Sequence, residues 1–179
     1  MMRQAQIWIS AVLYLALGVI VISLILAASI PVIDKLKDRN NVAETKELLL
    51  TLDDTIRIVG REGPGSRREL TPLTLTKGKL FIEDDQDVIR WELRTSAVIL
   101  ELGVNIREGP LSLLLAPTPV KEEYLMTVVV NYTDVFDLQL DSAYQSPFSG
   151  HYSAMISHSG AFSTSSRGET IPLITIRVV

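Results

Sequence analysis

The distribution of apolar residues divides the chain into two parts of different character. After a short polar start, residues 7–33 form an apolar block without a single charged side chain. As a helix, this block of about 27 residues would be about 40 Å long, whereas the hydrocarbon core of a bilayer is about 30 Å thick. The pattern therefore predicts a membrane-spanning segment ahead of a domain of soluble character.

Two interpretations of the block compete, a cleaved secretory signal and a retained helix. Arg3 fits the basic start of a signal peptide, and the small residues 27–29 fit its cleavage site. However, signal peptides have apolar regions of only about 7–15 residues, and here about 20 apolar residues precede Ala27. The helical pattern also continues well beyond this point. These features favour a retained helix.

Helical periodicity resumes after the polar boundary at residues 34–39. Leu49, Leu52, Ile56 and Val59 recur at spacings of three and four, which predicts one apolar helix face buried in a core. Asp53, Asp54 and Arg57 lie off this stripe, and Gly60 is expected to end the helix. We therefore predict a helix over residues 6–59, with its first half in lipid or against copies of itself.

Pro31 lies inside this predicted helix. Proline has no backbone N–H and clashes with the preceding turn, so we expect a kink near residues 27–28.

The charges around the apolar block give an ambiguous orientation for the span in the membrane. Lys35, Lys37 and Arg39 outnumber the positive charges before the block, and this count places the domain in the cytoplasm. The polar composition of the domain favours the outside.

Residues 60–179 change to a period of two, which predicts β-strands. Residues 98–106 alternate in polarity as one half-buried strand, and Lys77-Gly78 between two apolar alternations suggests a hairpin. Similar alternations recur at short intervals at residues 89–93, 111–115, 126–130, 136–140 and 174–178. The fold class is therefore α+β, with a long N-terminal hydrophobic helix followed by an antiparallel β-sandwich or barrel domain.

Residues 141–170 interrupt this pattern. They are rich in Ser, Gly, Tyr and Thr and have few aliphatic side chains. We expect a long surface loop or a set of short polar strands there. Such a stretch is more typical of an extracytoplasmic domain than of an intracellular one.

Composition excludes several functions. The net charge of the 179-residue chain is −4, and no dense cluster of Lys and Arg offers a nucleic-acid surface. Cysteine is absent, which excludes thiol catalysis and cysteine metal sites. We predict no catalytic residues, no cofactor and no metal, and we do not expect an enzyme.

The few residues able to support chemistry fit simpler interpretations. His151 and His158 lie near Asp141 and many serines, but no G-x-S-x-G motif accompanies them, so we expect solvated loop histidines. The acidic run at residues 83–87 has oxygen ligands for a hard cation but not EF-hand spacing, which favours an acidic turn. Asn131-Tyr132-Thr133 is an N-glycosylation sequon, a candidate for modification if the domain is exported.

The order of leader, retained helix and β-domain resembles the archaeal type IV pilin-like proteins. Arg3, Ala5 and Gln6 match the basic residue, small residue and glutamine around the leader cleavage site of that family. Ser10 stands where bacterial pilins carry an acidic residue, so the resemblance is to the archaeal group. It implies a leader of residues 1–5, cleavage between Ala5 and Gln6, and an outward-facing all-β domain over residues 60–179.

The resemblance also implies partners and a location. A pilin waits in membrane lipid, is processed by a leader peptidase, and is assembled by pilus machinery into a cell-surface filament through contacts with copies of itself. No nucleic acid is involved. A helix that is apolar on every face suits both settings, because it is stable in lipid and in a multi-helix bundle. Two alternatives remain, a single-span anchored binding or accessory domain that never polymerises and an anchored enzyme.

Overall fold

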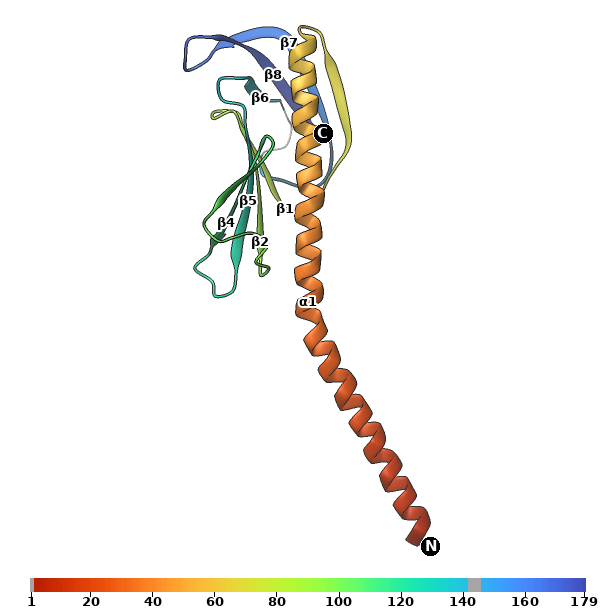
Figure 1. Cartoon of the computed structure of the whole chain (residues 1–179). Coiled ribbons are helices and arrows are strands. Elements are labelled where there is room, and N and C mark those ends of the chain that lie inside the picture. Colours follow the sequence, from red (N-terminus) through yellow and green to blue (C-terminus); the bar gives the residue numbers. More distant parts are fainter. Residues whose placement is uncertain (1, 142–145) are drawn as a thin grey trace. The chain divides into compact units, whose positions relative to one another are not determined.

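The protein is described by a computed structural model (Figure 1) that covers residues 2–141 and 146–179, with side chains from residue 11 onward. One long helix, α1 (Met2–Glu62), precedes the β-strands. The chain divides into two compact units, Met1–Asp38 and Arg39–Val179. The second half of α1 thus belongs with the strands, and the first half is a unit by itself.

Over the described residues, eight strands form one hydrogen-bonded sheet in the order β3-β4-β5-β2-β1-β7-β8-β6. All neighbouring strands are antiparallel except β6 and β8, and β3 and β6 are the edges. This arrangement confirms the α+β class. The strands are β1 (Arg67–Glu83), β2 (Val88–Thr95), β3 (Asn105–Glu108), β4 (Leu111–Pro117), β5 (Tyr124–Asn131), β6 (Asp137–Leu140), β7 (Phe148–Thr164) and β8 (Thr170–Val178).

The core of the second unit lies between α1 and the sheet. The predicted helix stripe is confirmed, because Leu49, Leu52, Ile56 and Val59 are all buried and join one apolar cluster with sheet residues such as Trp91. The charged residues that lie off this stripe are not all exposed. Asp53 is buried beside this stripe and accepts two hydrogen bonds from Arg57 Nε, at 3.0 and 2.9 Å.

The helix ends two residues later than Gly60, at Glu62. Gly63 has a φ of +85°, and its N–H donates to Val59 O, while the Ser66 hydroxyl donates to Val59 O at 2.8 Å. Gly60 does not end the helix, as was predicted, but makes room for a neighbouring side chain. A Cβ at this position would overlap the ring of Phe136, so the glycine allows the aromatic ring to pack directly against the helix.

The predicted hairpin at Lys77-Gly78 is wrong, because β1 runs through it without reversing. Residues 67–75 of β1 pair with β7, residues 79–83 pair with β2, and the register with β7 shifts between Leu75 and Leu80. Gly78 has a φ of +83° at this change of partners. The glycine allows a bend inside a continuous strand, which in sequence looks like a two-residue turn.

The strand predicted over residues 98–106 is also wrong. β3 begins only at Asn105, and Val98, Leu102 and Val104 of the preceding connection are 40–52% exposed. Gly103, at a φ of +74°, donates a backbone hydrogen bond to Leu115 O and turns the chain toward β4. The alternation of polarity in this segment therefore does not correspond to a sheet face.

The segment predicted as a polar loop or short strands contains instead the 17-residue strand β7. Within it, Ala154, Ile156 and His158 are buried at every second position, and the strand pairs with β1 on one side and β8 on the other. Its serines lie on the more exposed face. The low aliphatic content hid a central strand, because only one of its four buried positions, Ile156, has a large aliphatic side chain.

Candidate functional site: an exposed apolar helix and three polar clusters

The most distinctive surface of the first unit is apolar. Residues 11–36 of α1 are exposed at nearly every position, including Leu13, Tyr14 and Leu15 in succession at 64–75%. Successive helix positions point in different directions, so the apolar surface surrounds the helix. In the part of the chain that the structure describes, this is the one helix long and apolar enough to cross a membrane, by length and composition.

The polar side chains inside this block are satisfied within the helix. Ser23 Oγ donates to Val19 O at 2.8 Å, and Ser29 Oγ donates to Ile25 O at 2.7 Å. In both bonds the hydroxyl donates to the backbone carbonyl four residues earlier in the helix, so neither serine needs a water molecule as hydrogen-bond acceptor. The surface of this segment is thus compatible with an apolar environment such as lipid or a helix bundle.

The residues predicted to direct processing lie in α1, but their side chains are outside the described residues. This holds for Arg3, Ala5, Gln6 and Ser10, and cleavage between Ala5 and Gln6 stays a prediction. Pro31 is inside α1, which continues on both sides of it. The kink expected near residues 27–28 also stays a prediction.

The sequon lies at the end of β5, where its residues have different environments. Asn131 is exposed, and its Oδ1 accepts a hydrogen bond from Thr133 N at 2.8 Å, which closes an Asx-type turn. The Thr133 hydroxyl donates to Gln86 O at 3.1 Å, and Tyr132 between them is fully buried. The acceptor amide is therefore accessible on the surface of the second unit.

The two histidines and Asp141 are held in separate contacts. His151 is exposed and shares a 3.1 Å hydrogen bond with Thr74 Oγ1, and Asp141 accepts from Arg177 Nε at 2.9 Å. His158 contradicts the prediction of a solvated loop residue. It is 2% exposed, its Nδ1 accepts from Gly160 N at 3.1 Å, and its ring packs edge-on against Phe162.

The acidic run at residues 83–87 is the turn between β1 and β2, as expected. The structure adds Asp134 and Asp137, which join Asp84, Asp85 and Asp87 around a pocket of about 260 Å³ that is also lined by Ser163–Ser166. The sequence did not predict this cluster, because Asp134 comes from the β5–β6 connection and Asp137 from the start of β6, about 50 residues further along the chain. Within the described residues, no group of three or more acidic or histidine side chains is arranged to hold a metal ion.

Asp87 is the most constrained member of this acidic cluster. Its Oδ1 accepts from Leu138 N at 2.8 Å, its O accepts from Tyr132 N, and its φ is +55°. Burial raises the pKa of the Asp87 carboxyl, and the charges of Asp137, Asp134 and Asp84 raise it further, while the bond from Leu138 lowers it. Asp87 thus connects the β1–β2 turn to the following strands at an electrostatic cost.

A second polar cluster that was not predicted lies between α1 and the sheet. Arg57, held by Asp53, lies with its guanidinium carbon 6.0 Å from the ring centre of Tyr132. Tyr132 Oη lies near the Asp53 carboxylate without good hydrogen-bond geometry, and has no hydrogen-bond partner among the described residues. Burial, and then the negative charge of Asp53, raises the pKa of Tyr132. The i,i+4 spacing of Asp53 and Arg57 was the one available signal.

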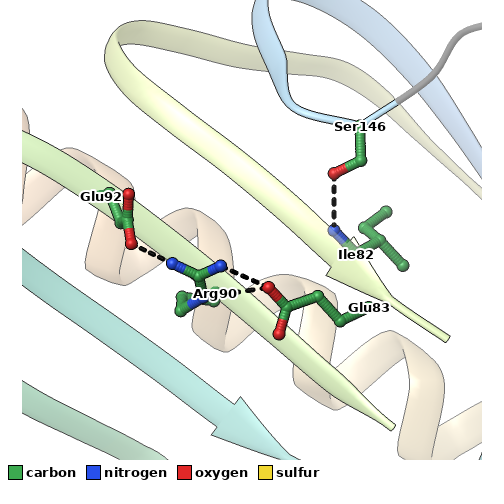
Figure 2. Close-up of polar contacts among 5 residues, drawn as sticks. All are labelled: Ile82, Glu83, Arg90, Glu92 and Ser146. Carbon is green, nitrogen blue, oxygen red and sulfur yellow. Dashed lines mark hydrogen bonds and ion pairs between the residues drawn. The ribbon is translucent and has the colours of Figure 1, made fainter. Parts of the chain in front are cut away.

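The third cluster lies on the outer face of β1 and β2. Figure 2 shows Arg90 between two carboxylates, with its guanidinium bonded to Glu83 on one side and Glu92 on the other. Its guanidinium carbon lies 4.5 Å from the centre of the Phe81 ring. Next to it, the Ile82 backbone N–H donates to Ser146 Oγ at 3.3 Å (Figure 2), which connects β1 to the start of the β7 segment.

Comparison with known proteins finds no matching family model, no matching curated protein and no matching solved structure.

Proposed function

We propose that this protein is the subunit of a type IV pilus-like surface filament, of the archaeal pilin-like kind. Before assembly, the first half of α1 anchors the chain in the membrane, and after assembly it packs in a bundle with the same segment of other copies. The β-domain faces outward and coats the filament. The proposal includes leader removal after Ala5 by a leader peptidase, and insertion by assembly machinery.

One observation carries the proposal, namely that residues 11–33 are uncharged, almost entirely apolar and exposed on every side of the helix. A span that only anchors a domain needs about 20 apolar residues. Here the uncharged block of residues 7–33, about 27 residues, exceeds that length, and its large apolar side chains from Val12 to Ile33 are exposed. A helix of this kind is stable in lipid and also in a bundle of identical helices, and assembly needs both states.

The second unit supports the proposal by being complete without the first. Its apolar cluster includes helix residues only from Val42 onward. The domain therefore keeps its core when the first half of α1 leaves the membrane for a bundle. Contacts that repeat from copy to copy without closing generate a helical fibre.

The test is Leu15→Asp, compared with Leu15→Ala in the same position. Leu15 is 72% exposed and lies one turn from Gly18, where helices can approach closely. A charge at the centre of a span costs about 2.5–3.5 kcal/mol, which a block this apolar tolerates on insertion. In a bundle the same cost recurs in every subunit.

We therefore expect Leu15→Asp to remain in the membrane fraction and to abolish filaments, whereas Leu15→Ala retains both. Electron microscopy of cell-surface filaments, with mass spectrometry of this chain in them, is the readout. A wild-type chain that stays in the membrane and never enters a filament would support the alternative of an anchored binding or accessory domain.

A further inference from the structure

Several exposed apolar side chains of the second unit gather at one end of the sheet. Gly103 of the β2–β3 connection donates to Leu115 O near the end of β4, and the next turn joins β4 to β5. The same connection begins after Thr95, which pairs with Tyr124 at the start of β5. The side chains on these two segments, which are 40–57% exposed and which we call the apolar rim, are Val98, Leu102, Val104 and Val120.

Both segments that carry the apolar rim are fixed from within. In the β2–β3 connection, Ile99 and Leu100 pack against the core cluster. In the β4–β5 turn, Thr118 N donates to Glu123 O, and Glu123 N donates to Val120 O. A partner surface therefore meets a preformed patch, and little conformational entropy is lost on contact.

The rim lies at the end of the second unit from which α1 enters it. Tyr132, directly after β5, lies beside Arg57, so the end of β5 is level with the C-terminal part of α1. β5 runs nearly along this part of α1 (Figure 1), and its 8 residues cover about 26 Å. The same length of helix contains about 17 residues. The start of β5, with the rim, is therefore level with the first turns of the helix in this unit, which begins at Arg39.

The chain length between the apolar block and the second unit brings this end close to the bilayer. The uncharged block ends at Ile33, and Arg39 follows after about 9 Å of helix. The polar layer on each side of the hydrocarbon core is about 5–7 Å thick. A chain anchored by this block therefore holds the rim within reach of the lipid surface.

The chemistry of the rim fits a lipid surface. Exposed apolar side chains are unremarkable singly, but a gathering of them marks a contact with a protein or a membrane. The charges beside the rim, at Glu101, Lys121 and Glu122, have both signs and do not select a charged protein partner. The boundary of the acyl chains accepts valine and leucine without a complementary shape, and the Lys121 ammonium group can stay among the headgroups.

We propose that the apolar rim is a second membrane contact. In the anchored subunit its side chains rest in the acyl-chain boundary of the lipid surface from which α1 emerges. This inference rests on the membrane anchor of the proposed function, and the rim holds the β-domain against the bilayer until the subunit leaves it. The contact is the same whether or not the chain later enters a filament.

The absence of cysteine allows single labels in the full-length chain. Val120→Cys and Leu102→Cys probe the rim, and Leu15→Cys probes the span. Val135→Cys is the matched control, because Val135 is 43% exposed, like Leu102, but follows the opposite end of β5. Each variant is labelled with a nitrobenzoxadiazole maleimide and reconstituted in phosphatidylcholine vesicles, with and without lipids that carry a nitroxide near the top of an acyl chain.

We expect the nitroxide lipids to quench the labels at Val120 and Leu102 about twofold more than the label at Val135, because apolar surfaces in the interface lie about 5–10 Å deep. Val98→Asp and Val104→Asp, added to the Val120→Cys chain, should lower its quenching to the level of Val135, since buried charges oppose the contact. Near-ultraviolet circular dichroism confirms that the aspartate variant remains folded.

The outcomes separate this inference from the proposed function. Quenching at Leu15 with equally low quenching at Val120, Leu102 and Val135 would overturn the rim contact and leave the anchor and the filament standing. An unquenched label at Leu15 would reject the anchor itself, and the rim contact with it. Cross-linking of Val120→Cys chains to one another by a bis-maleimide, without quenching, would assign the rim to a second copy and overturn the lipid contact. Quenching at the rim of a chain that never forms filaments would support the contact and reject the filament.

Discussion

Gly78→Ala is expected to destabilise the second unit far more than the same change at a comparable glycine. Gly78 has a φ of +83°, which L-residues rarely adopt, and it faces the side chain of Trp91. A Cβ built on Gly78 would be 2.6 Å from Trp91 Cε2 and 2.6 Å from Glu92 O. Trp91 is fully buried, so its ring has no free space in which to move.

The magnitude follows from three contributions. The left-handed backbone costs an L-residue about 1–2 kcal/mol. Displacing a well-packed core side chain costs about 1–3 kcal/mol. The displaced indole also weakens its 3.1 Å hydrogen bond to Lys77 O, a loss of about 1 kcal/mol. We therefore expect a decrease of about 3–6 kcal/mol in the free energy of unfolding, among the large values that core overpacking and backbone strain produce.

Gly168→Ala is the matched control. Gly168 has a φ of +81°, and a Cβ there would meet nothing within 4 Å, so only the backbone contribution of about 1–2 kcal/mol applies. For a unit of about 140 residues, 1 kcal/mol corresponds to about 4 °C in Tm. Gly78→Ala should thus melt roughly 10 °C below Gly168→Ala.

The assay is thermal unfolding of the full-length chain in detergent, followed by near-ultraviolet circular dichroism, which reports the packing of Trp91. Equal Tm values for the two variants, with an unchanged tryptophan signal, would refute the reasoning. That result would mean that β1 does not pass Trp91 at Gly78, and that the two halves of the strand are arranged differently.

Three further predictions concern the charges and the modularity of the second unit. Asp87→Asn should raise the free energy of unfolding at pH 7 by about 0.5 kcal/mol. The folded-state pKa of Asp87 is raised, so its carboxylate destabilises the fold once the pH rises above the unfolded value, and the gain should vanish near pH 3 in urea titrations. Tyr132→Phe removes a buried hydroxyl without a partner among the described residues and should raise Tm by a few degrees, whereas a lower Tm would reveal a hydrogen bond to Asp53. Deletion of residues 1–33 should leave a soluble β-domain that is monomeric at micromolar concentration by size-exclusion chromatography, and aggregation with little β signal would contradict the independence of its core.

The sequence alone determined the features that depend on long, regular patterns. The apolar block specifies a helix whatever surrounds it, since about 27 uncharged residues leave no other stable arrangement in an apolar medium. The stripe from Leu49 to Val59 likewise fixed which face of the helix is buried. The polarity alternations of β2, β4, β5 and β8 identified strands, because each of these fills an inward face with large apolar side chains.

Only the tertiary structure decided the features that depend on neighbours distant in sequence. Gly78 is a bend instead of a turn because β7 and β2 pair with successive parts of one strand, and the polar β7 is a strand because β1 and β8 lie on both sides of it. Residues 98–104 alternate in polarity yet find no sheet partner over most of their length. The acidic pocket also depends on contacts between residues distant in sequence. The local sequence pattern reflects the conformational preference of each residue. Strand pairing depends instead on which other strand lies beside it in the folded chain.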